Sequence, residues 1–137
     1  DVIDWLLNKV RSYIFTTGAP PLLAEGLLTA LELIEQGDGR RAHLNALIAR
    51  FKTGLRLQRW QLLPSDTPIQ PLVIGDNHET LAVSRALDAE GLWVPAIRPP
   101  TVAKGSARLR IVLSAAHSNE QVDRLVATLQ RLEAAQP

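Results

Sequence analysis

The sequence contains no cysteine among its 137 residues. This excludes a disulfide framework, a zinc site with thiolate ligands and a cysteine nucleophile. Aromatic residues make up only 4% of the sequence, so a surface that stacks nucleic-acid bases is not expected. The net charge is only +1, whereas nucleic-acid-binding proteins concentrate basic residues on one face. We therefore predict no nucleic-acid partner.

Long apolar runs are also missing. No stretch approaches the roughly 20 apolar residues that a membrane-spanning helix needs, and no signal-peptide pattern is present. Hydrophobic residues nevertheless make up 46% of the sequence and charged residues 21%, which is typical of a chain that packs a core. The length fits one domain, or one domain with a piece of another. We expect a cytoplasmic protein with no membrane partner.

The first 36 residues differ in character from the rest. Apolar residues recur at helical spacing in 2–12 and again in 21–36, with an apolar turn between the two segments. Two such helices cannot bury their apolar faces by themselves and need a further partner. The chain also opens on Asp1 without a methionine. We therefore expect a fragment in which residues 1–36 end a larger domain and residues 37–137 form a small C-terminal domain.

Residues 37–137 show two periodicities. Short segments are apolar or alternate between apolar and polar residues, as strands do, and longer ones repeat every three to four residues, as helices do. The predicted helices are 40–57, 77–90 and 118–134, and the predicted strands are 69–74, 92–98 and 107–114. This order predicts an α+β fold: a small, mainly antiparallel sheet with helices on one face.

Local signals place the ends of several elements. Ser118 and Gln121 have the spacing of a capping box, which predicts the start of the last helix. Asn77 is expected to cap the helix that follows it. Pro71 lies inside a predicted strand and is expected to place that strand at a sheet edge or a bulge, because proline cannot donate to the ladder.

Three arginines stand in the last two strand segments. Because strand side chains alternate between faces, Leu109 is expected beneath the helices, with Arg108 and Arg110 on the opposite face. Arg98 ends the neighbouring strand. These guanidinium groups are either the solvated face of an open sheet or a site that binds a carboxylate or phosphate, for which arginine has a suitable rigid fork.

Thr101 follows two prolines, Pro99 and Pro100. Each proline restricts the residue before it, so the loop is stiff. Two interpretations stay open: the loop holds the threonine hydroxyl in a fixed position, or it is only a rigid connection between strands.

Several segments resemble a known family. "GDNHETLAVSRALDAEGLWVPAIRPPTVAKGSARLRIVLSAAHSNEQVDRL" (75–125) resembles the C-terminal domain of the α-oxoamine synthases, which are fold-type-I pyridoxal-phosphate enzymes. "YIFTTGAPP" (13–21) is similar to the family's segment after the cofactor lysine, and "GDGRRAHLNALIARFKTGL" (37–55) to its linking helix. "AIRPPTV" (96–102) favours the biotin-pathway branch, the 8-amino-7-oxononanoate synthases, over the 2-amino-3-ketobutyrate ligases.

The resemblance implies roles for single residues. Arg110 matches the family's group for the amino-acid carboxylate, and Thr101 matches a threonine that contacts the substrate. Arg98 belongs to the same motif. Thr16 and Thr17 match the pair that reaches the cofactor phosphate of a neighbouring subunit, which implies a site shared across a homodimer. Residues 1–36 would then end the large cofactor-binding domain.

The implied reaction is a decarboxylative condensation in biotin biosynthesis. Its cofactor is pyridoxal 5′-phosphate, which acts as an electron sink. Its substrates are L-alanine and a pimeloyl thioester, either pimeloyl-CoA or pimeloyl-acyl carrier protein. The product is 8-amino-7-oxononanoate.

The sequence departs from the family at the Schiff-base lysine, which lies upstream of the segments matched here. Of the three lysines, Lys9, Lys52 and Lys104, none stands in its place. His117 is expected to be a capping or structural residue rather than a catalytic base. We therefore predict that this polypeptide alone has no synthase activity. The alternatives are a stand-alone module that binds a small anion and a dimerisation piece without a ligand.

The other two histidines also differ from the family's ring-stacking histidine, which is expected upstream. His43 and His78 are expected at the surface. No residue of this chain is therefore assigned a catalytic role from the sequence.

Overall fold

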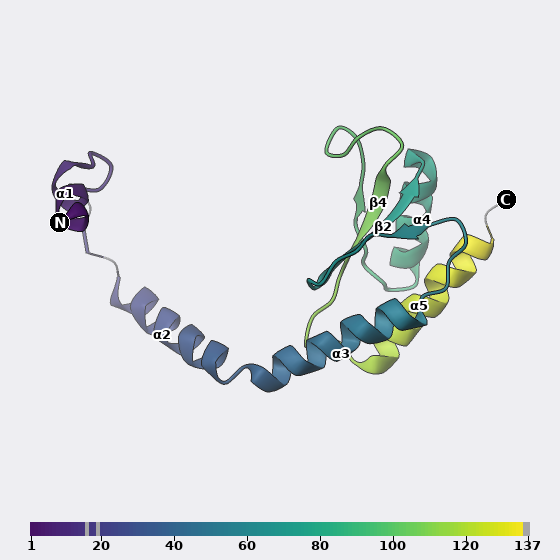
Figure 1. Ribbon diagram of the computed structural model, residues 1–137, viewed down its shortest axis with the longest axis horizontal. Coiled ribbons are helices and arrows are strands. Elements are labelled where there is room, and N and C mark those ends of the chain that lie inside the picture. The colour runs from purple at the N-terminus through teal and green to yellow at the C-terminus, as the bar shows by residue number, and fades with distance from the viewer. Residues whose placement is uncertain (16, 19, 136–137) are drawn as a thin grey trace. The chain divides into compact units, whose positions relative to one another are not determined.

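The chain forms two compact units, Asp1–Asp38 and Gly39–Pro137, in a computed structural model (Figure 1). The structure describes residues 1–15, 17–18 and 20–135.

The first unit contains two helices, α1 (Val2–Lys9) and α2 (Pro21–Glu35). The Asp1 carboxylate caps α1 by accepting a hydrogen bond from the Ile3 N–H, and Pro21 occupies the first turn of α2, where its missing N–H costs nothing. No residue of either helix is buried. Large apolar side chains that remain more than half exposed include Val2, Ile3, Trp5, Leu22, Leu23, Leu27, Leu28, Leu31 and Ile34.

Helix α1 is shorter than the sequence predicted. It ends at Lys9, since Val10 has extended dihedrals and its carbonyl accepts hydrogen bonds from the Tyr13 and Ile14 N–H groups of the following turn. A β-branched residue is a poor continuation of a short helix that lacks tertiary support.

The second unit contains a four-stranded sheet and three helices. The strands are β1 (Gln61–Leu62), β2 (Ile69–Gly75), β3 (Ala96–Ile97) and β4 (Ala107–Val112), and the helices are α3 (Asp38–Gly54), α4 (Asn77–Ala89) and α5 (Asn119–Ala134). The strand order is β1-β2-β4-β3, and every neighbouring pair is antiparallel. Figure 1 shows α4 beside the β2–β4 pair.

Strand β2 is internal, so Pro71 does not mark an edge strand. The other predicted alternative was a bulge, and β2 does have a register shift between Val73 and Gly75, two residues further on. The Pro71 carbonyl accepts the Leu63 N–H at 3.0 Å, on the β1 side. In an antiparallel ladder the N–H and C=O of one residue face the same neighbour. The missing N–H of Pro71 therefore faces β1, which has only two residues, and costs no bond to β4.

Strand β3 is much shorter than the predicted segment 92–98. Leu92 closes the turn that follows α4, since its N–H donates to the Leu87 carbonyl. Pro95 has no N–H, although its carbonyl accepts a hydrogen bond from Arg110 N–H. Prolines also follow at 99 and 100, so regular pairing is confined to Ala96–Ile97.

All three helices contribute to one core on one face of the sheet. Buried side chains from the helices meet Leu72 of β2 and Leu109 and Ile111 of β4. The helix residues are Leu47, Ile48 and Phe51 of α3, Val83 and Leu87 of α4, and Val122, Leu125 and Leu129 of α5. The predicted α+β fold, with helices on one face of a small antiparallel sheet, is confirmed.

The helix caps agree with the sequence at one end and differ by one residue at another. The capping box of α5 is present: Ser118 N–H donates to Gln121 Oε1 at 2.9 Å, and Gln121 N–H donates to Ser118 Oγ. For α4 the cap is Asp76, whose carboxylate accepts the Glu79 N–H at 2.8 Å, and Asn77 is already the first helical residue.

A buried carboxylate joins α5 to the connection between α3 and β1. Glu133 accepts hydrogen bonds from the backbone N–H groups of Gln58, Arg59 and Trp60 at 2.9, 2.8 and 2.8 Å. Burial opposes its ionisation, but these three donors outweigh burial and lower the pKa of Glu133.

Within the described residues, no helix is both long enough and apolar enough to cross a membrane.

Candidate functional site

The face of the sheet opposite the helices is the first feature of the site. Along β4, Ala107, Leu109 and Ile111 are buried, whereas Arg108 is half-buried and Arg110 is exposed. The alternation predicted from the sequence is therefore confirmed. The residues paired with this face through the register are Ile69, Pro71 and Val73 of β2 and Ile97 of β3. We call these residues, with Arg108, Arg110 and Val112, the open face.

Arg110 lies in the middle of the open face between two prolines. Its register partner on β2 is Pro71, and its N–H donates to the Pro95 carbonyl at 2.9 Å on the other side. Within the described part of the chain, its guanidinium has no hydrogen-bond or ion-pair partner. A guanidinium held on a rigid strand with all its donors available can bind an anion in bidentate fashion.

Arg108 stands two residues away on the same face and differs in its contacts. Its Nε donates to the Ser106 carbonyl at 3.0 Å, and its stem lies between its register partners Val73 and Ile97. The two arginines of the "RLR" sequence are thus not equivalent, because one is engaged with the protein and the other is available.

The other two predicted substrate-contacting residues lie in the loop between β3 and β4. Arg98 directly follows β3, Thr101 follows three residues later, and both are exposed. The Thr101 N–H donates to the Arg98 carbonyl at 3.0 Å, so the two residues share one turn.

The predicted phosphate-contacting pair lies in the first unit. Thr17 is exposed, between α1 and α2. Thr16 lies outside the described residues.

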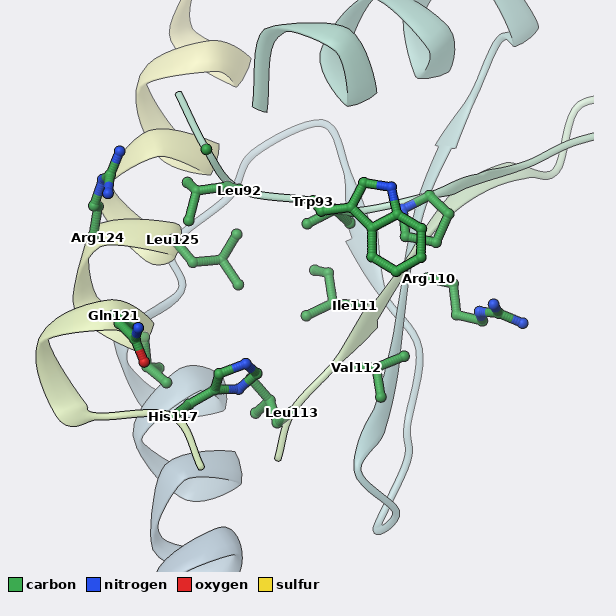
Figure 2. Close-up of a pocket in the computed structure, with 14 residues that line it drawn as sticks. Leu92, Trp93, Arg110, Ile111, Val112, Leu113, His117, Gln121, Arg124 and Leu125 are labelled. Carbon is green, nitrogen blue, oxygen red and sulfur yellow. The ribbon is translucent and has the colours of Figure 1, made fainter. Parts of the chain in front are cut away.

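A pocket of about 380 Å³ lies between β4, α5 and the segment that leads into β3. Its walls are mainly apolar and include Leu92, Ile111 and Leu125, with His117 at one end. Figure 2 shows the Arg110 side chain pointing away from this pocket, although the residue contributes to its wall. The guanidinium therefore serves the open face rather than the pocket, which the sequence did not predict because its walls come from distant segments.

His117 has the structural role that the sequence predicted. Its Nδ1 accepts the Ser114 N–H at 3.1 Å, and its carbonyl oxygen lies 2.9 Å from Nε2 of His43. The ring thus holds the entry to α5. His43 and His78 are exposed, as expected.

The lysines show whether this chain could hold pyridoxal phosphate covalently. Lys52 Nζ lies 3.3 Å from Asp66 Oδ1 on the second unit, whereas Lys9 ends α1 and Lys104 is an exposed loop residue. None of the three stands among the residues of the open face. That none of the three lysines attaches the cofactor stays a prediction from the sequence. Within the described residues, no three side chains of the usual metal-ligand types are grouped to hold a metal ion.

Comparison with known proteins decides the family. The family model for aminotransferases of class I and II matches residues 1–129. The chain belongs to this family. An 8-amino-7-oxononanoate synthase from Aromatoleum aromaticum is 66% identical over 134 residues, which are 98% of this chain and 35% of that protein. The aminotransferase-family chain thus spans about a third of the length of the curated relatives it matches.

Solved structures share the fold of this chain. A serine palmitoyltransferase from Sphingomonas wittichii is 28% identical, with a TM-score of 0.82, and the match covers 97% of this chain and 34% of that one. A serine palmitoyltransferase from S. paucimobilis with a bound PLP–myriocin aldimine is 24% identical, with a TM-score of 0.71 over 91% of this chain and 32% of that one. The fold of this aminotransferase-family chain is therefore that of the corresponding third of these proteins.

Proposed function

We propose that this chain forms the part of an 8-amino-7-oxononanoate synthase that binds the carboxylate of the amino-acid substrate. The observation that carries the proposal is Arg110: a guanidinium without a partner among the described residues, on a sheet face that no helix of its own unit covers. High identity to synthases of this name over nearly the whole chain supports it. The likeness to the motifs "AIRPPTV" and "RLRIVLSAAH" points to the same reaction.

Arg110 would act mainly by orientation. Its fork donates two parallel hydrogen bonds to a carboxylate, which fixes the direction of the amino acid as well as its position. Holding one reactant in a fixed geometry lowers the entropic part of the barrier.

Thr101 and Arg98 would contact the substrate from the neighbouring turn. The threonine hydroxyl can donate or accept a hydrogen bond, and its turn is closed by the Thr101–Arg98 backbone bond. In the proposed reaction, the Cα of L-alanine forms a bond to the acyl carbon of a pimeloyl thioester. The C–S bond of the thioester breaks and the thiol of the acyl carrier leaves, and the alanine carboxylate is lost as carbon dioxide. The acyl donor is pimeloyl-CoA or pimeloyl-acyl carrier protein.

Pyridoxal phosphate, when bound, supplies the electron sink for this chemistry. The residues of this chain that would hold it are Thr16 and Thr17, through the phosphate. The exposed Thr17 hydroxyl fits that task. The proposal includes a homodimer, in which these threonines reach the partner's cofactor, and a cytoplasmic location, which suits a chain without cysteine.

A chimera tests the proposal. This chain replaces the matching segment of the Aromatoleum aromaticum synthase. The activity of the chimera is then measured with L-alanine and pimeloyl-CoA. We expect the chimera to be active and Arg110→Met to lower kcat/KM for alanine about 100-fold, because a charged hydrogen-bonded partner is lost. The matched control is Arg85→Met, an exposed arginine on α4, on the helix side of the sheet.

An inactive chimera that is folded, or equal effects of the two arginine variants, would contradict the proposal. The 137-residue chain by itself is expected to show no turnover and no stable absorbance band with pyridoxal phosphate. The alternatives, a stand-alone anion-binding module or a dimerisation piece, are not favoured, since synthases match nearly the whole chain.

A further inference from the structure

The loop between β3 and β4 is held by few interactions. Residues 98–106 are all exposed or half-buried, so no side chain anchors the loop in the core. The loop consists of two turns: the first is closed by Thr101 N–H and the Arg98 carbonyl, and the second by Ser106, whose N–H and Oγ both donate to the Ala103 carbonyl at 3.1 and 2.7 Å. Gly105 in the second turn has a φ of +77°, which favours glycine.

Arg108 is the one side chain of β4 that reaches back to this loop through a recorded hydrogen bond among the described residues. Its Nε donates to the Ser106 carbonyl at 3.0 Å, which is the end of the second turn. The aliphatic part of Arg108 is half-buried between the positions of Val73 and Ile97 on the open face. A guanidinium whose stem is packed and whose Nε is bonded is fixed in direction.

We propose that Arg108 is a positioning residue: its bond to the Ser106 carbonyl fixes the 103–106 turn at the entry to β4 and thereby steadies the 98–106 loop, which carries Thr101 and Arg98. The two arginines then divide the work on one strand face, since Arg110 binds the anion and Arg108 fixes the loop that completes the site. The part of this inference that concerns the substrate rests on the proposed function. The bond between Arg108 and the loop does not depend on it.

The first test measures the loop directly in the 137-residue chain. Hydrogen–deuterium exchange is followed by mass spectrometry in peptides that cover 98–106. Arg108→Met is expected to speed exchange there about fivefold, the factor that corresponds to one ordinary hydrogen bond, with α5 and β2 unchanged. Arg110→Met, on the same face and without a partner in the described residues, is expected to leave the loop unchanged. Arg108→Lys, which keeps a donor, is expected to restore part of the protection.

Ser106→Ala gives a second, independent variant if Arg108→Met folds poorly. It removes the Oγ bond to the Ala103 carbonyl and leaves the Arg108 side chain intact. We expect faster exchange in 98–106 alone. Unchanged loop exchange in Arg108→Met would overturn the proposal, and so would a rise spread over the whole second unit, because that would make Arg108 an ordinary stability residue.

The second test uses the chimera with the Aromatoleum aromaticum synthase. Arg108→Met is expected to lower kcat/KM for alanine about tenfold, less than Arg110→Met, with partial rescue by Arg108→Lys. Loop loosening without any kinetic effect would overturn the link between the loop and the substrate. An inactive parent chimera would instead count against the proposed function, while the exchange result would still decide whether Arg108 holds the loop.

Discussion

The two units of the chain differ in whether their apolar side chains are buried. In the second unit, Phe51, Leu72 and Leu109 are completely inaccessible to solvent. In the first unit no helical residue is buried, and Leu27 is 67% exposed. Both units have apolar residues at helical spacing, so periodicity alone does not distinguish them. The difference lies in whether a second layer covers the apolar face of the helices. The sheet is that layer for α3, α4 and α5, whereas no described residues bury α1 and α2.

The largest expected effect comes from a cavity in the core of the second unit. Leu109→Ala should lower the free energy of unfolding by about 3 kcal/mol, because a buried leucine loses its contacts and leaves a void. Leu27→Ala in α2 is the matched control and should change it by less than about 0.5 kcal/mol. Denaturant unfolding followed by circular dichroism measures both. Similar losses in the two variants would mean that α2 is buried in the protein in solution.

A smaller effect is expected from the carboxylate that joins α5 to the 58–60 connection. Glu133→Gln should cost about 2 kcal/mol at pH 7, because the charged acceptor of three N–H groups is lost. The folded-state pKa of Glu133 is lowered, so its contribution is present above the ordinary glutamate pKa and disappears as the pH falls through the folded value. The gap between wild type and variant should therefore narrow as the pH falls below the ordinary glutamate pKa of about 4.3 and towards the lower folded value.

Thermal unfolding between pH 7 and pH 3 measures this gap. Glu32→Gln on α2 is the control and should show no gap at any pH, since Glu32 is exposed on a helix without buried residues. A gap that stays constant over this whole pH range would show that Glu133 acts through packing rather than through its charge.

The smallest effect is expected from removing the first unit. A chain of residues 39–137 should have a midpoint of thermal unfolding within about 4 °C of that of the full chain. A loss of about 1 kcal/mol shifts the midpoint of a domain of this size by that much or more, and removing the first unit is expected to cost less than that. Residues 1–38 alone should show no cooperative transition, since isolated helices of 8 and 15 residues are marginal in water. Binding of a hydrophobic dye should fall on truncation. A large drop in the midpoint would show that the two units stabilise each other.

Much of the second unit could be predicted because its signals are local. The Ser118–Gln121 capping box and the alternation around Leu109 depend on residues within three positions of each other. Strand β1 was not predicted, since two residues are too few to show alternation. The cap of α4 was displaced by one residue because Asp76 and Asn77 are both good caps, and only the backbone conformation chooses between them.

The unpredicted parts of the site depend on contacts between distant segments. Arg108 and Arg110 look alike in the sequence, and only the bond from Arg108 to the Ser106 carbonyl separates their roles. Pro71 suggested an edge or a bulge because proline has no N–H. The sequence does not show which neighbouring strand that missing donor faces. Glu133 stands near the end of a helix, where a carboxylate is usually solvated, and its donors lie 73 to 75 residues earlier.

That separation sets an order of events during synthesis of the protein. The amides of Gln58, Arg59 and Trp60 leave the ribosome more than 70 residues ahead of the carboxylate that accepts from them. Until Glu133 emerges, water must form the hydrogen bonds to those amides. The connection between α3 and β1 then lacks the bonds that fix its conformation. A nascent chain that stalls inside α5 would therefore lack the carboxylate that fixes the turn at Trp60.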